Sequence, residues 1–411
     1  MAAEAAVAGT TPTNTKSTTW QEWFGNIRAD ILAGIVVALA LIPEAIGFSL
    51  IAGVDPSVGL YASVAIAMVI ALVGGRPGMI SAATAAVAVV VIPLVKDYGV
   101  EYLFAATILM GIIQGIAAIL RLDLLMQFVS RSVITGFVNA LAILIFLAQI
   151  PQLTNVGWET YAMVAAGLAI IYGFPRITKV VPSPLVAIVL LTAVAVFWNL
   201  PVNNVAGEGK LPDGLPTFGI PDVPFTWETL MIILPYSLTM AAVGLLESLL
   251  TAQIVDDMTH TDSNKQRETW GQGVANTVAA FFGGMGGCAM IGQSMINVNS
   301  GGRGRTSGIT AALGLLAFIL FASGLIEQIP LAALVGVMFI VVIGTFEWSS
   351  FRIMKKVPKA DAFVIVLVSG VTVATDLAVA VVVGVIVLDG RVVHGLFLSH
   401  LITPTISDQL I

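Results

Sequence analysis

The stretch GGMGGCAMIGQSMINVNSGG, residues 283–302, begins with a Gly-rich piece and becomes helix-like only further along. The stretch GRPGMISAATAAVAVVVIPL, residues 75–94, has the same order. Both belong to a chain that is 58% hydrophobic and 10% charged, whereas soluble domains carry about 25% charged residues. The composition therefore indicates an integral membrane protein. Each stretch is predicted to be a short strand leading into a half-helix near the bilayer centre, and the two strands are expected to pair because unpaired backbone is not tolerated there.

Fourteen membrane segments are predicted from the apolar runs between charged residues, Pro and Gly. Most match the ~20 residues that a spanning helix needs, and the third, ninth and tenth are shorter. The expected fold class is an all-α multi-pass membrane protein in which segments 3 and 10 are each a strand plus a half-helix. The segments lie near residues 30–54, 57–74, 79–94, 101–120, 126–150, 158–174, 183–200, 228–250, 270–285, 287–300, 306–326, 331–347, 360–375 and 377–396.

The basic residues predict the orientation of these segments. Of the 18 Lys and Arg residues, only Lys96 and Lys210 would lie outside if the N-terminus is cytoplasmic, which is a strong positive-inside bias. Both termini are therefore expected on the cytoplasmic side of a cell membrane. Seven segments precede the loop 201–227 and seven follow it, so the two halves form an inverted repeat, as in many transporters. The expected division is a cytoplasmic tail 1–27, repeat 28–200, extracellular loop 201–227, repeat 228–396 and cytoplasmic tail 397–411.

Three long stretches carry a resemblance to a known family. They are IPEAIGFSLIAGVDPSVGLYAS (42–63), ESLLTAQIVDDMTHTDSNKQRETWGQGVAN (247–276) and FGGMGGCAMIGQSMINVNSGGRGRTSG (282–308). Over about residues 28–396 the chain resembles the sulfate permease (SulP) family of anion transporters. The resemblance implies a core domain of segments 1–4 and 8–11, a gate domain of segments 5–7 and 12–14, and an anion held between segments 3 and 10.

The chain departs from the family pattern at three points. The signature Pro-x-Tyr-Gly-Leu-Tyr reads Pro56-Ser57-Val58-Gly59-Leu60-Tyr61 here and lacks its first tyrosine. Relatives often have glutamine where this chain has Glu44. The STAS domain that most members carry at the C-terminus is absent from these 411 residues, which puts regulation through that domain in doubt.

Two glutamates lie in the middle of predicted segments, Glu44 in the first segment of one half and Glu247 in the first segment of the other. An acid at membrane depth is costly and is by default functional. Burial without a positive partner favours the neutral form of Glu44, which makes it a candidate proton carrier. Phe48, four residues on, shares its helical face, and the resemblance places an aromatic residue there beside the anion. A structural role for Glu44 and an ordinary core position for Phe48 are the alternatives.

Glu247 shares a helical face with Thr251. It is a candidate for a second titrating acid, and Glu247 with Thr251 is alternatively an oxygen-rich sodium site. The resemblance places the acidic or hydroxyl group of this segment nearest the substrate. A structural hydrogen-bonding pair is the third interpretation.

The residues at the expected half-helix starts are candidates for substrate binding. Facing helix N-termini present positive dipole ends and free N–H groups, which favour an anion, and small side chains let it approach the backbone. Ser and Thr at these positions are equally typical of structural helix caps. With Glu44, Phe48 and Glu247, the candidate set comprises Ser81, Ala83, Thr84, Ile291, Gly292, Gln293 and Ser294. The cluster Asp256, Asp257, Asp262, Lys265, Arg267 and Glu268 is interpreted instead as a solvated cytoplasmic loop without chemistry.

The leading hypothesis is a secondary active transporter that moves a small anion (sulfate, dicarboxylate or bicarbonate class) together with a proton by alternating access. Anion exchange and sodium-coupled symport are the alternatives, and a nucleobase permease is favoured less. The spans contain no Ser/His, His/Glu/His or paired-Asp arrangement, so no enzyme is predicted. No cofactor or metal site is expected beyond a coupling ion, H⁺ or alternatively Na⁺. The expected partners are a small anion and the bilayer, with a second copy of the chain as a homodimer partner, and no nucleic acid.

Overall fold

The computed structural model describes residues 19–122, 131–177, 182–208 and 214–350, together with 366, 367, 369 and 370. The helices of the first half are α1 (Thr19–Phe24), α2 (Ile27–Ala52), α3 (Pro56–Val73), α4 (Ala85–Tyr98), α5 (Val100–Ile119), α6 (Arg131–Gln149), α7 (Trp158–Gly173) and α8 (Ser183–Phe197). The second half contributes α9 (Trp227–Thr259), α10 (Lys265–Phe281), α11 (Ile291–Asn299), α12 (Arg305–Glu327) and α13 (Leu331–Thr345). The predicted segments 360–375 and 377–396 lie outside the described residues apart from four positions, so the count of fourteen stays a prediction.

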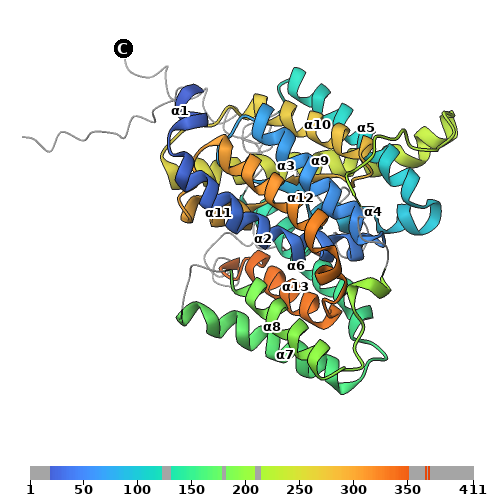
Figure 1. Ribbon diagram of the computed structural model, residues 1–411. Coiled ribbons are helices and arrows are strands. Elements are labelled where there is room, and N and C mark those ends of the chain that lie inside the picture. The colour runs from blue at the N-terminus through green and yellow to red at the C-terminus, as the bar shows by residue number, and fades with distance from the viewer. Residues whose placement is uncertain are drawn as a thin grey trace, which may run out of the picture.

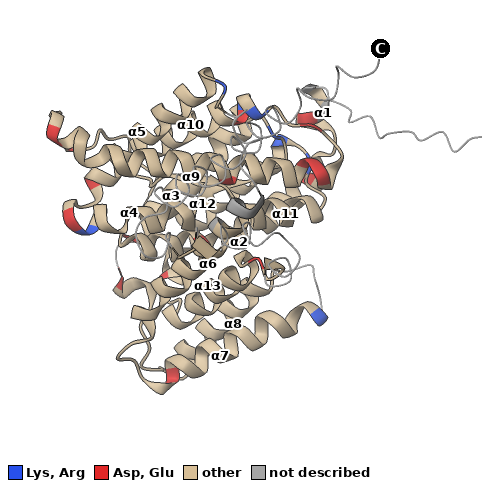
Figure 2. Ribbon diagram, turned by 180° about the vertical axis from the view of Figure 1, so that it is seen from behind, with Lys and Arg blue, Asp and Glu red and all other residues tan. Residues whose placement is uncertain are grey.

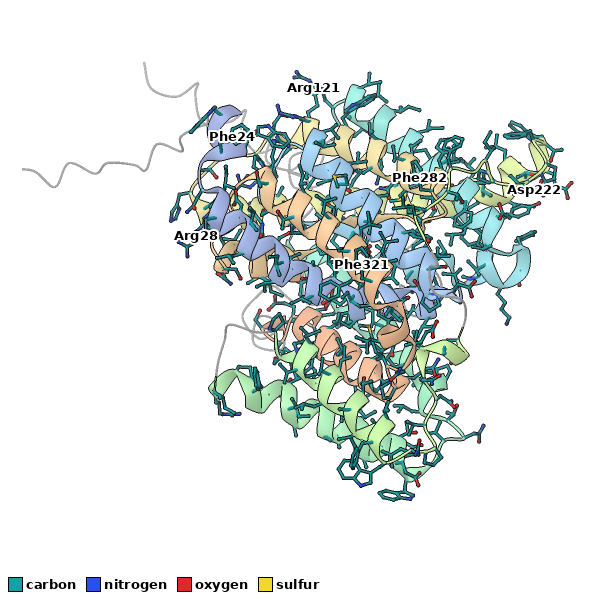
Figure 3. The ribbon with its side chains drawn as sticks, viewed as in Figure 1. Phe24, Arg28, Arg121, Asp222, Phe282 and Phe321 are labelled. Atoms are coloured by element: carbon teal, nitrogen blue, oxygen red, sulfur yellow. The ribbon has the colours of Figure 1, made fainter. Side chains whose placement is uncertain are left out.

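Five of the described helices, α2, α3, α5, α9 and α12, are long and apolar enough to cross a bilayer. Lys, Arg, Asp and Glu gather mainly at the ends of the helices, and the middle of the molecule is largely free of them (Figure 2). Large apolar side chains also face outward, as Phe321 on α12 does with 87% of its surface exposed (Figure 3). These features are those of a helical integral membrane protein.

Several helices have a polar N-cap residue whose side chain bonds to the first turn. The side-chain oxygens of Asn26, Thr226 and Asn264 accept hydrogen bonds from first-turn amides of α2, α9 and α10, at 3.3, 3.2 and 2.9 Å. Such caps satisfy amides that have no partner within the helix. Because Thr226 caps α9, this helix begins at Trp227, the last residue of the predicted external loop 201–227.

Two short strands pair with each other in the interior of the molecule. Strand β1 (Ser81–Ala83) pairs antiparallel with β2 (Gly287–Ala289), with Ala82 opposite Cys288, so the pairing expected from the two Gly-rich stretches is present. Close approach requires Gly287, because a Cβ there would collide with the carbonyl oxygen of Ala82. Helix α4 follows β1 directly and α11 follows β2, so the two helices leave the ribbon from its opposite ends.

The described helices form two groups (Figure 1). In the larger group, α2, α3, α4, α5, α9, α10, α11 and α12 surround the two strands. The smaller group contains α6, α7, α8 and α13 and lies against one side of the larger group, where α13 contacts α2. Below, the two groups are called the strand-containing group and the α6–α8/α13 group. The described helices of the strand-containing group are those expected in the core domain, and those of the α6–α8/α13 group are expected in the gate domain; the assignment of segments outside the described residues stays a prediction.

Candidate functional site

The starts of α4 and α11 are the centre of the candidate site. Their N-cap residues are Thr84 and Met290, both in extended backbone conformation, and neither makes a side-chain cap hydrogen bond. Thr84 is a residue type that normally caps, so its failure to do so is unusual. The amides of both first turns are therefore left uncapped at the two ends of the same ribbon.

At the start of α11, an acid of the first half meets the half-helix of the second half. The side chain of Gln293 forms a hydrogen bond with Glu44 of α2. Gln293 is 1% exposed, and among the described residues its Oε1 has no hydrogen-bond partner. Gly292 is exposed with open space beside its Cα, and Ile291 is half-buried. The structure thus brings Glu44, Ile291, Gly292 and Gln293 together, with an accessible position at the helix start.

At the start of α4 the arrangement is reversed: an acid of the second half lies near the half-helix of the first half, and a thiol lies between them. The Cys288 Sγ donates to Glu247 Oε2 at 3.0 Å and lies 3.2 Å from Thr84 Oγ1. Glu247 of α9 is therefore linked to the N-cap of α4 through Cys288. Each glutamate lies beside the half-helix of the opposite half of the chain. Cys288 was not identified as a site residue from the sequence, because the sequence shows only that this cysteine follows a Gly-rich piece.

The remaining candidate residues have mainly structural surroundings. Ser81 Oγ accepts a hydrogen bond from Gln272 Nε2 at 2.8 Å, and Ser294 Oγ accepts one from the Ile80 amide at 3.0 Å. Ala83 and Phe48 are buried in the hydrophobic core of the molecule. These contacts favour a supporting role for Ser81 and Ser294, and no described contact separates a core role from a binding role for Phe48.

Thr251 lies beside Glu247, as the predicted sodium site requires. Its Oγ1 donates to the Glu247 carbonyl at 2.7 Å and lies 3.5 Å from the Ala289 carbonyl. Within the described ranges, no group of three or more His, Cys, Asp or Glu side chains is placed to hold a metal ion. The local oxygens are thus one carboxylate, one hydroxyl and main-chain carbonyls, an oxygen set of the kind hard cations prefer.

The profile of the sulfate permease family matches residues 27–166 and 152–368, well over half of the chain. The chain belongs to the sulfate permease family. The Bacillus subtilis protein named "Putative sulfate transporter YbaR" is 59% identical over 91% of this chain and 78% of its own length. "Bicarbonate transporter BicA" of Picosynechococcus is 30% identical over 89% of this chain and 70% of its own length.

Solved structures agree with this architecture. The transmembrane domain of a cyanobacterial bicarbonate transporter BicA superposes with a TM-score of 0.78, at 28% identity over 87% of this chain and 98% of that domain. Murine Slc26a9, described as an anion transporter in the inward-facing state, gives a TM-score of 0.78 at 15% identity over 89% of this chain and 68% of its own, a likeness of fold alone. The family resemblance read from the motifs is confirmed. The protein is a membrane-embedded member of a family of anion transporters, not of enzymes.

In this member of the family, the polar cluster that begins at Asp256 is only partly the solvated loop that the sequence predicted: Asp257, Asp262 and Arg267 are exposed, whereas Asp256 and Glu268 are not. Asp256 lies on α9, which ends at Thr259 and not near residue 250, and its carboxylate is 3.2 Å from Arg76 Nε. Glu268, in the first turn of α10, is fully buried and accepts from the Gly75 and Arg76 amides at 2.7 and 3.1 Å. For Asp256 and Glu268 the prediction was wrong, because their partners lie about 190 residues away in sequence. They fix the segment that leads into β1.

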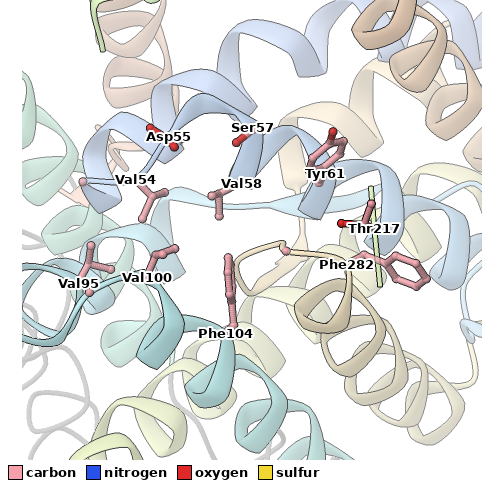
Figure 4. A pocket seen from close by; sticks show the side chains of 13 residues that line it. Val54, Asp55, Ser57, Val58, Tyr61, Val95, Val100, Phe104, Thr217 and Phe282 are labelled. Atoms are coloured by element: carbon pink, nitrogen blue, oxygen red, sulfur yellow. The ribbon is translucent and has the colours of Figure 1, made fainter. Parts of the chain in front are cut away.

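A separate cavity of about 540 Å³ lies at the far end of α2 and α4 from these charges (Figure 4). Its walls are about equally polar and apolar, with Val54 and Val58 on one side and Phe104 facing them from α5. Asp55, Ser57, Tyr61 and Thr217 add polar groups around it. None of the predicted site residues lines this cavity, so it is distinct from the half-helix starts.

Proposed function

We propose that the protein is a secondary active transporter that carries a small anion of the sulfate, dicarboxylate or bicarbonate class across the cell membrane together with a proton. The observation that carries the proposal is the pair of uncapped half-helix starts, each with a half-buried glutamate beside it. Names of the relatives support the substrate class, since they include sulfate and bicarbonate transporters.

Anion binding at these helix starts follows from elementary electrostatics. Each helix N-terminus carries a partial charge of about +0.5 and N–H groups without helical partners. The first turns of α4 and α11 contain no Lys or Arg, so the attraction is modest. Modest binding suits a site that must release its cargo in every cycle. It also recognises charge more than chemical identity, which leaves the three substrate classes open.

The position of the two acids supports the proposed proton coupling. An ionised carboxylate about 4 Å from an anion is repelled by roughly 4 kcal/mol at an effective dielectric constant of ~20. A proton on Glu44 or Glu247 removes that repulsion, so proton and anion each favour the binding of the other. Among the described residues, neither glutamate forms a salt bridge that would neutralise it instead.

The architecture proposed for this cycle is a fourteen-segment inverted repeat of seven plus seven. The strand-containing group carries the anion, and it moves relative to the α6–α8/α13 group so that the site opens to either side in turn. Arg28 at the start of α2 and Asp222 before α9 lie on opposite sides of the strand-containing group (Figure 3), which supports the placement of the start of α2 and the loop before α9 on opposite sides of the membrane. Both termini are proposed to be cytoplasmic. Assembly as a homodimer is a further part of the proposal.

The test is transport by purified protein in liposomes with imposed pH, Na⁺ and anion gradients. We expect an inward proton gradient to drive uptake of labelled sulfate or bicarbonate. Glu44→Gln should abolish that dependence, because the amide keeps the contact with Gln293 but does not titrate. Glu327→Gln, at the exposed end of α12, is the matched control and should retain coupling.

Each alternative predicts a different outcome. Sodium-driven uptake that is lost in Glu247→Gln and Thr251→Val would replace proton coupling with sodium symport. Uptake that requires an anion on the opposite side and ignores pH would indicate exchange. Normal proton-driven uptake in Glu44→Gln would remove Glu44 as the proton carrier.

A further inference from the structure

The hydroxyl of Thr84 points away from the helix that it begins. Thr at an N-cap usually accepts a hydrogen bond from an amide of the first turn. Here Thr84 Oγ1 makes no such bond and lies 3.2 Å from Cys288 Sγ. The thiol is the centre of a chain of three side chains, since it also donates to Glu247 Oε2 at 3.0 Å.

This arrangement is held firmly in place. Cys288 is the middle residue of β2 and pairs with Ala82 of β1, and it is fully buried. Thr84 is only 2% exposed, so water does not compete freely for either group. The adjacent Ala289 amide donates to Ser248 Oγ at 3.0 Å, which fixes the strand against α9. Within the described residues, Cys288 Sγ is the hydrogen-bond partner that the Thr84 hydroxyl has in place of a first-turn amide.

We propose that Cys288 is a positioning residue for anion transport: its thiol holds the Thr84 hydroxyl away from the first turn of α4 and keeps the amides there open to the anion. The inference rests on the proposed function, because it takes those amides as one side of the anion site. The facing half-helix independently points to a ligand, since the buried Gln293 Oε1 there has no partner in the described part of the chain.

Removal of the sulfur should make Thr84 a competitor of the anion. In Cys288→Ala, the hydroxyl loses its partner and turns to cap its own helix, occupying an amide that the anion needs. We expect the apparent KM for the anion to rise roughly fivefold, the size of one N-cap hydrogen bond, with little change in the maximal rate. Cys288→Ser supplies a hydroxyl at the same place and should restore most of the lost affinity.

A double-mutant cycle separates this mechanism from simple packing. Valine at position 84 has no hydroxyl and does not cap, so Cys288→Ala should leave KM unchanged when made on top of Thr84→Val. An equal rise of KM in both backgrounds would overturn the proposal, because the effect would then come from lost packing or from Glu247. An unchanged KM in Cys288→Ala alone would overturn it as well. Thr107→Val is the matched control, since it removes a buried hydroxyl that donates to the Leu103 carbonyl of its own helix α5 at 2.8 Å, and it should not raise KM.

A spectroscopic measurement distinguishes failure of this inference from failure of the proposed function. The chain has one cysteine, so its infrared S–H stretch reports Cys288 alone. Thr84→Val and Glu247→Gln should each shift that band if the two contacts exist in solution, and a band unmoved by Thr84→Val overturns the proposal. Absence of anion uptake by the wild-type protein, with both band shifts present, would instead refute the proposed function and with it the assigned role of these contacts.

Discussion

Gly292 is the residue at which the candidate site is most open. It stands in the first turn of α11, and a Cβ added to it would meet nothing within 4 Å. Its backbone is not among the positive-φ glycines, so a larger side chain does not strain it. Ala83, another candidate residue at these helix starts, is a poorer probe, because its side chain is buried and a leucine there would overpack the core.

Gly292→Leu should therefore fold and yet abolish transport, because the leucine fills the space in front of the α11 amides. Uptake in liposomes and monodispersity in detergent measure the two properties separately. Gly324→Leu is the matched control, since that glycine of α12 also has open space beside it and lies away from the ribbon. Normal affinity in a well-folded Gly292→Leu protein would mean that the anion does not bind at this helix start.

The residues of the site were predictable to different degrees. Glu44 and Glu247 could be identified from the sequence because an acid within an apolar run is conspicuous whatever its neighbours are. Thr84 was identified as a helix start, yet its contact with Cys288 was not, since that contact depends on which strand residues face each other. A register of two strands 200 residues apart is a property of the packed molecule.

At the scale of elements, the ribbon is held by polar side chains that come from helices far along the chain. Glu268 accepts from two amides of the segment before β1 and from Gln272 Nε2, at 2.9 Å in the last case. Gln272 in turn donates to Ser81 within β1. The Gly-rich stretches predicted the strands themselves, because Gly and small residues fit where backbones approach closely. The same stretches contain no signal that Glu268, far along the chain, would fix the segment before β1.

Glu268→Ala should lower the thermal stability of the purified protein by several degrees. The substitution leaves two buried backbone amides without an acceptor and removes one of the two acceptors of Gln272 Nε2, and each unsatisfied buried group costs about 1–3 kcal/mol. Thermal unfolding followed by size-exclusion chromatography measures the shift. Glu228→Ala, an exposed acid in the first turn of α9, is the matched control and should melt within about a degree of wild type. Equal melting of the two variants would show that the buried carboxylate does not hold the ribbon.

At the scale of the whole molecule, the sequence carries a signal for the orientation of the chain but none for its packing. The predicted positive-inside bias of Lys and Arg rests on no knowledge of any contact, and the orientation it gives stays a prediction. How the α6–α8/α13 group sits against α2 depends on interlocking side chains of many helices, such as the stacked rings of Phe146 and Phe339 within that group. No periodicity in the sequence specifies such pairings.

The inverted repeat makes a prediction about which loops share a side of the membrane. Asn203 lies between α8 and α9, and Asp262 lies between α9 and α10, so a single spanning helix separates them. Cysteines placed singly at these two positions in a Cys288→Ser background should react with a membrane-impermeant maleimide from opposite sides. In intact cells we expect labelling of the Asn203→Cys protein alone, and in inverted vesicles of the Asp262→Cys protein alone. Both positions are exposed or on turns, so a lack of reaction in permeabilised membranes would indicate misfolding and would be scored as such. Labelling of both proteins from one side would mean that α9 does not span the membrane, and the opposite orientation of the two halves, on which the facing half-helices depend, would have to be abandoned.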